Sequence, residues 1–75
     1  MVEVKYTKQN PLWVQAESVE KVAPGYVNVT AYGETFSTCR VRWGNLIHGR
    51  RKSHVLVENS RGDWLCVWFY DADAR

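Results

Sequence analysis

The stretch that most constrains the fold is His54–Tyr70, HVLVENSRGDWLCVWFY. Two apolar runs, His54–Glu58 and Trp64–Tyr70, are rich in Val, Leu, Trp, Phe and Tyr, which favour strands. The intervening Asn, Ser, Gly and Asp tolerate the backbone angles of a reversal. This pattern predicts a β-hairpin with a loop of about four or five residues and Gly62 in the left-handed conformation.

The second run of this hairpin has two apolar faces. Trp64, Cys66, Trp68 and Tyr70 point one way, and the residues between them point the other way. A strand that is apolar on both sides is typical of a strand covered on both sides. We therefore expect Trp64–Tyr70 to be the central strand, with the rest of the chain wrapped around it.

The chain before residue 24 has one clear strand pattern and one ambiguous segment. Val2–Lys8 alternates apolar and polar residues, which predicts a half-buried edge strand. Segment 11–23 fits a helix that starts at Pro11 and ends before Pro24-Gly25. It also fits two strands with a bulge near Ser18, and this second interpretation is favoured because a Pro-Gly turn often joins neighbouring strands.

Two further strands are expected at Tyr26–Tyr32 and Thr35–Trp43. A two-residue turn at Gly33-Glu34 would join them and place Phe36 beside Ala31. The segment 44–53, GNLIHGRRKS, has little periodicity and is interpreted as a loop. Residues 71–75 are polar and terminal, so they are expected to fray.

These elements predict that residues 1–75 form one mainly β domain. The expected architecture is a small barrel, or a strongly bent antiparallel sheet of five to six strands, similar in shape to SH3 and OB barrels. One short helix at 11–23 is the alternative for that segment. The predicted core consists of apolar residues from the expected strands: Val4, Val27, Val29, Val41, Leu56, Leu65, Val67 and Phe69.

Charge is distributed unevenly along the chain. Between Thr35 and Val57 there are five Lys and Arg residues and no Asp or Glu. The rest of the chain holds five basic and eight acidic residues. This asymmetry predicts an anionic partner for one part of the surface, although a solvated basic loop is the alternative.

Nucleic acid is the first anionic partner to consider. Basic side chains attract phosphates and release condensed counterions, and aromatic residues such as Trp13, Tyr32 and Trp43 stack on unpaired bases. The sequence therefore predicts a non-catalytic nucleic-acid-binding domain that contacts mainly the phosphate backbone. The predicted binding residues are Arg40, Arg42, Trp43, His48, Arg50, Arg51 and Lys52.

The alternative function is a protein-binding module. Trp, Tyr and Arg dominate the binding energy of many protein interfaces, and this chain has four Trp and four Tyr. Such a module would be a homo-oligomer or an inhibitor, of the kind carried by phages and mobile elements, that binds a larger host complex. Its partner would present an acidic protein surface, and Trp43 is the expected anchor.

Metal binding and catalysis are not expected. Cys39, Cys66, His48 and His54 each stand alone, whereas structural zinc usually draws ligands from closely spaced pairs. Buried thiols are favoured over a disulfide. No nucleophile turn or phosphate-binding loop is present, so neither an enzyme nor a cofactor is predicted. With no leader peptide and no apolar run of ~20 residues, we expect a cytoplasmic protein without a membrane segment.

Overall fold

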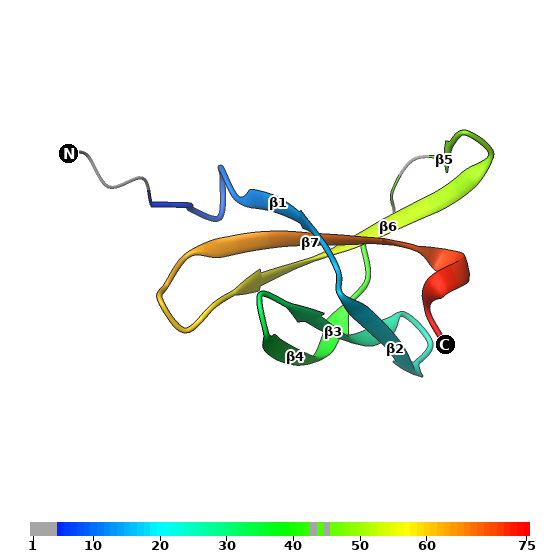
Figure 1. Cartoon of the computed structure of the whole chain (residues 1–75), viewed down its shortest axis with the longest axis horizontal. Coiled ribbons are helices and arrows are strands. Elements are labelled where there is room, and N and C mark those ends of the chain that lie inside the picture. The colour runs from blue at the N-terminus through cyan, green and yellow to red at the C-terminus, as the bar shows by residue number, and fades with distance from the viewer. Residues whose placement is uncertain (1–4, 43, 45) are drawn as a thin grey trace.

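The computed structural model describes residues 5–42, 44 and 46–75. Within these ranges the strands form two sheets, in the orders β1-β7-β6-β5 and β2-β3-β4 (Figure 1). The elements are β1 (Leu12–Gln15), β2 (Ser18–Ala23), β3 (Tyr26–Ala31), β4 (Glu34–Arg40), β5 (Leu46–Ile47), β6 (Arg50–Glu58), β7 (Trp64–Tyr70) and the short 3-10 helix η1 (Asp71–Asp73).

The β6–β7 hairpin is the centre of the four-stranded sheet. Its strands are antiparallel, with Val55 opposite Val67, and its loop spans residues 59–63 with Gly62 at φ 81°. The side-chain oxygen of Asn59 accepts hydrogen bonds from the backbone N–H groups of Arg61 and Asp63. The predicted hairpin and the left-handed Gly62 are confirmed.

Segment 11–23 forms two strands, so the helix alternative is wrong. β1 runs parallel to β7, with Leu12 opposite Leu65. The chain then changes sheets at Ala16-Glu17: the Ala16 N–H donates to Trp68 of the first sheet, and the Glu17 N–H donates to Thr30 of the second. A helix would have lost the alternation that leaves Leu12 half-buried and Trp13 exposed.

The β3–β4 turn lies one residue earlier than the sequence pattern indicates. Its central residues are Tyr32 and Gly33, at φ 51° and 72°, which is the pattern of a type I′ turn. Phe36 therefore lies opposite Val29, and the placement beside Ala31 is wrong. The sequence did not indicate this register because Tyr32 occupies the first turn position, and a positive φ is uncommon for a bulky side chain.

The expected loop at 44–53 is wrong, because this segment forms a second hairpin. β5 pairs with the start of β6 through a two-residue turn at His48-Gly49, with φ 51° and 76°. Gly44 precedes β5 and lies against β6, because a Cβ placed there would overlap the Lys52 carbonyl oxygen. The basic run Arg50–Lys52 is therefore the start of β6. Charged residues are compatible with a strand there because this part of β6 is exposed or half-buried.

The core lies between the two sheets, which face each other in Figure 1. Its buried apolar residues come from β3, β6 and β7: Val27, Val29, Ala31, Val55, Val57, Leu65, Val67 and Phe69. Val41 packs against this cluster from its edge. Leu56 was expected in the core but points to the opposite face of β6, between inward-facing Val55 and Val57. Val4 lies outside the described residues.

The mainly β class is confirmed, but the described strands form no closed barrel and the SH3- or OB-like shape is not confirmed. Of the predicted N-terminal strand, residues 2–4 lie outside the described residues, and Lys5–Lys8 form no strand. After β7 the chain forms η1, Ala74 packs against the core, and the Lys21 N–H donates to the Arg75 carbonyl. No described helix is long and apolar enough to span a membrane.

Candidate functional site

The side of the four-stranded sheet that faces away from the core carries a mixed aromatic and basic surface, here called the outer face. Strand alternation places its members, because the residues between them point into the core. Arg42 joins them because it forms a bridge with His54, and paired residues point the same way. The outer face consists of Trp13, Gln15, Arg42, Arg50, Lys52, His54, Leu56, Glu58, Trp64, Cys66, Trp68 and Tyr70.

Basic groups lie directly over aromatic rings on this face. The Lys52 ammonium lies 3.8 Å from the centre of the Trp68 ring, and the Arg50 guanidinium lies 4.0 Å from the centre of the Tyr70 ring. The rings of Trp68 and Tyr70 meet edge to face, with centroids 5.7 Å apart. Cation–π contact thus holds two positive charges above a half-buried aromatic pair.

A third cation marks the other end of β7. Lys8, from the segment before β1, lies 5.5 Å from the centre of the Trp64 ring. Glu58 is directly opposite Trp64 and is the acidic residue of the outer face. The positive charge is therefore concentrated at the end of the face that holds Lys52, Arg50 and Arg42.

Trp13 reaches across the face from the edge strand. Its ring centroid lies 5.2 Å from that of His54, although β1 and β6 are separated by β7 and so by about 10 Å. The β7 residue opposite Trp13 is Cys66, whose side chain is small and which is only 3% exposed. Trp13 itself remains 56% exposed. An indole therefore lies across the middle of the face and is open to solvent.

Burial and the nearby basic side chains shift the pKa values of two residues on the outer face, His54 and Cys66. Burial lowers the pKa of His54 below its usual range, and the positive charges of Arg42 and Lys52 lower it further. Burial raises the pKa of the Cys66 thiol, and the charge of Arg42 offsets part of that rise. His54 is therefore a neutral imidazole near pH 7, between two cations whose repulsion an anion would relieve.

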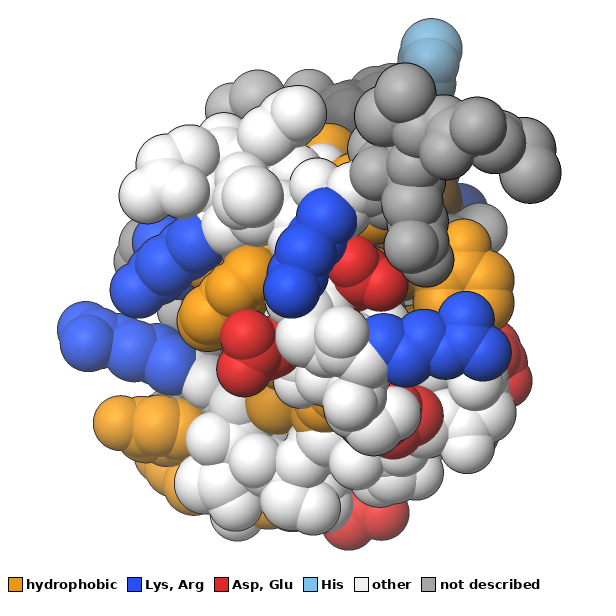
Figure 2. Space-filling view, turned by 90° about the vertical axis from the view of Figure 1, so that its left-hand side faces the viewer, with side chains coloured by type: hydrophobic (Ala, Val, Ile, Leu, Met, Phe, Trp, Pro, Cys, Tyr) orange, Lys and Arg blue, Asp and Glu red, His pale blue; other side chains and the backbone are white. Residues whose placement is uncertain are grey.

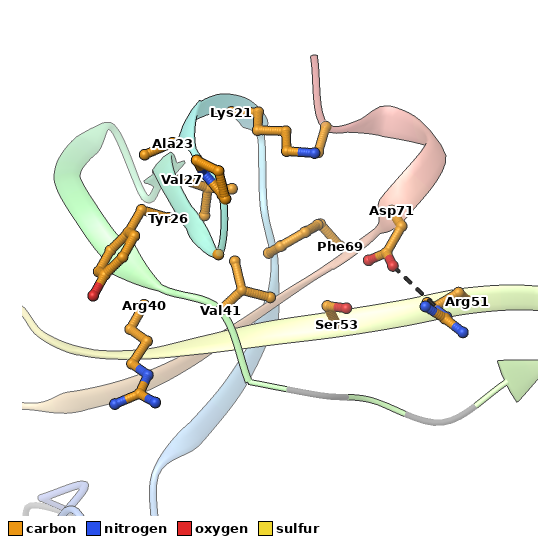
Figure 3. Close-up of a pocket in the computed structure, with 13 residues that line it drawn as sticks. Lys21, Ala23, Tyr26, Val27, Arg40, Val41, Arg51, Ser53, Phe69 and Asp71 are labelled. Carbon is orange, nitrogen blue, oxygen red and sulfur yellow. Dashed lines mark ion pairs between the residues drawn. The ribbon is translucent and has the colours of Figure 1, made fainter.

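The remaining basic residues of the acid-free segment lie on the other side of the sheet. Arg40 ends β4, and Arg51 points to the core side of β6, where its Nε atom is 4.0 Å from Asp71 Oδ2. With Lys21 they line an open pocket of about 610 Å³ between the ends of the two sheets (Figure 3). Figure 3 shows an apolar interior made by Val27, Val41 and Phe69.

The structure therefore divides the predicted site residues. It brings Arg42, Arg50 and Lys52 together on the outer face, whereas Arg40 and Arg51 line the pocket. His48 is exposed in the β5–β6 turn. Trp43 lies outside the described residues. The expected strand Thr35–Trp43 extends too far, because β4 ends at Arg40 and Arg42 pairs with His54 of β6.

The predicted binding residues did not include the aromatic residues of β7, although Trp13, which was expected to stack on unpaired bases, lies on the outer face. Trp64, Trp68 and Tyr70 share one side of β7, and this side is half-buried rather than covered by another layer of described residues. The alternation in the sequence does reveal that these three residues lie together. Their apolar character, however, favoured a covered face, because sequence alone does not show which face the second sheet packs against.

The rest of the described surface provides weaker candidates for a functional site. On the end of the molecule shown in Figure 2, the acidic and basic side chains of the described residues are interspersed, so these residues present no extended area of one sign. Among the residues that the structure describes, no group of three His, Cys, Asp or Glu side chains could hold a metal ion. The thiols of Cys39 and Cys66 are both free.

Comparisons with protein-family models, with curated proteins and with solved structures find no match for this chain. Its function is therefore inferred from the chemistry of its surface.

Proposed function

We propose that this protein is a non-catalytic nucleic-acid-binding domain whose outer face contacts the phosphate backbone. The observation that carries the proposal is the convergence of Arg42, Arg50 and Lys52 on one aromatic sheet face. Two of these cations lie on β6 and the third lies in the segment that pairs with it, and all three point the same way. Phosphates are attracted to such a cluster without a fixed geometry, and they release their counterions on binding.

The position of these cations over rings supports this function. Contact with Tyr70 and Trp68 fixes Arg50 and Lys52 before any ligand arrives, so less side-chain entropy is lost on binding. The pKa of His54 is lowered by burial and then by the positive charges of Arg42 and Lys52, so a negative charge added at this place would be favourable. The same charges oppose pairing of this face with a copy of itself.

A salt titration with matched variants tests the proposal. The test variant carries Arg42→Gln, Arg50→Gln and Lys52→Gln, and the control carries Lys21→Gln, Arg40→Gln and Arg61→Gln, so that both lose the same charge. For a single strand, each lost phosphate contact reduces the slope of log K against log salt by about 0.7. We expect the test variant to lose about 2 units of slope and the control to stay close to wild type. Equal losses in the two variants would contradict the proposal.

A protein-binding module is the second candidate, because Trp13, Trp64 and Trp68 gather on this same face. Its partner would carry an acidic surface to complement the cations. A pull-down treated with nuclease distinguishes the two functions. A partner retained after digestion supports protein binding, and a partner lost with the nucleic acid supports the proposal above.

A further inference from the structure

We propose that the outer face selects single-stranded over duplex nucleic acid, with an unpaired base stacked on the Trp13 indole and the adjoining phosphates on Arg42, Arg50 and Lys52. This inference rests on the proposed function and names the form of nucleic acid that the face takes. Trp13 lies on the edge strand β1, while the three cations lie on and beside β6 at the opposite side of the face. A strand of nucleic acid lying across the sheet would meet both.

The exposure of the aromatic rings assigns the stacking role to Trp13. Trp68 and Tyr70 are half-buried and each has a cation above its ring. Trp13 is 56% exposed and is tilted by 58° against the His54 ring, which supports it from the β6 side. A large exposed indole braced by a neighbouring ring is a suitable platform for a base. In a duplex the faces of internal bases are already stacked on each other, so this platform would find no ligand.

The described elements do not favour groove binding. The helix in the described part of the chain is η1, which has three residues and directly follows Tyr70, the last residue of β7. The β5–β6 hairpin is the element that resembles a groove-binding ribbon, but β5 has two residues. One of the ribbon's cations, Arg50, is held on the outer face by Tyr70. A broad sheet face with aromatic and basic residues instead fits the way proteins bind single strands.

The test compares a thymidine oligonucleotide of about ten residues with a fully paired, blunt-ended duplex at the same phosphate concentration, by fluorescence anisotropy at low salt. We expect tighter binding to the single strand. Trp13→Ala should weaken single-strand binding by about fivefold or more, while Trp13→Phe keeps most of it. Tyr32→Ala is the matched control, because Tyr32 is an exposed aromatic residue on the other sheet. Duplex binding should be the same for all of these proteins.

A second measurement needs no protein variant. Replacing the bases of the oligonucleotide by abasic sugars keeps the phosphates, and we expect it to weaken wild-type binding as much as Trp13→Ala does. Duplex binding as tight as single-strand binding would overturn the inference and leave the proposed function standing. Undiminished binding of the abasic strand would overturn it in the same way. Absence of binding to every oligonucleotide would contradict the proposed function itself.

Discussion

The Lys52 ammonium lies 3.8 Å from the centre of the Trp68 ring, on the strand next to its own. This contact fixes a positive charge on an otherwise aromatic surface. We expect Lys52→Gln to lower the free energy of unfolding by only about 0.5–1 kcal/mol, because the site is partly exposed. Its affinity for nucleic acid should fall several-fold, since one phosphate contact is lost. Lys21→Gln, on the other sheet, is the control, and equal affinities of the two variants would contradict this role.

Proton uptake should accompany binding at His54. Burial lowers the pKa of this imidazole, Arg42 and Lys52 lower it further, and a phosphate placed among these cations would raise it again. Affinity for a single strand should therefore increase as the pH falls into the range in which the bound protein takes up this proton. His54→Gln should remove this increase, whereas His48→Gln, an exposed change in the β5–β6 turn, should keep it. A pH profile that is identical for wild type and His54→Gln would contradict the prediction.

The same imidazole makes stability depend on pH in a defined direction. Its pKa is lower in the folded protein than in the unfolded chain, so the unfolded state binds the proton more readily. The resulting stability is fully present above about pH 6.5 and is lost as the pH falls through the folded pKa. In urea unfolding, wild type should lose more stability between about pH 7.5 and 5.5 than His54→Gln does. Parallel losses in the two proteins would show that His54 does not contribute.

The features that could be predicted from the sequence are those set by local patterns, whereas those set by contacts between distant segments could not. The β6–β7 hairpin could be predicted from its apolar runs and from the turn-forming residues Asn59 and Gly62, because both signals are local in the sequence. The choice of face was not local: Leu56 points outward and Val55 inward because the second sheet packs on that side of β6. The grouping of Arg42 with His54 depends on a bridge between residues distant in sequence, so periodicity within one segment could not predict it.

The half-buried Gly44, which precedes β5, tests the local packing of the basic hairpin. A Cβ at Gly44 would overlap the backbone carbonyl group of Lys52, so the two backbones would have to separate. We expect Gly44→Ala to lower the melting temperature and to weaken binding together. Gly49→Asn is the control, because no atom lies within 4 Å of its Cβ position and Asn tolerates a positive φ. An unchanged melting temperature for Gly44→Ala would show that this contact is not formed.

The two faces of the four-stranded sheet should respond differently to truncation. Leu65 is 2% exposed between the sheets, so Leu65→Ala should lower the free energy of unfolding by about 2–5 kcal/mol. Trp13→Ala removes a larger but mostly exposed side chain and should cost much less. Chemical denaturation of both variants measures this difference. A larger loss for Trp13→Ala would mean that the outer face, rather than the space between the sheets, is the core.

The most direct test of the central claim is a map of backbone and indole NMR shifts during titration with a thymidine oligonucleotide. The account predicts that the shifts that change cluster on the outer face, at Trp13, Arg42, Lys52, His54 and Trp68. Resonances of Val27 and Val41, which line the pocket on the other side of the sheet, should stay unchanged. Changes centred on that pocket, or none at saturating oligonucleotide, would contradict the assignment of the outer face as the binding surface.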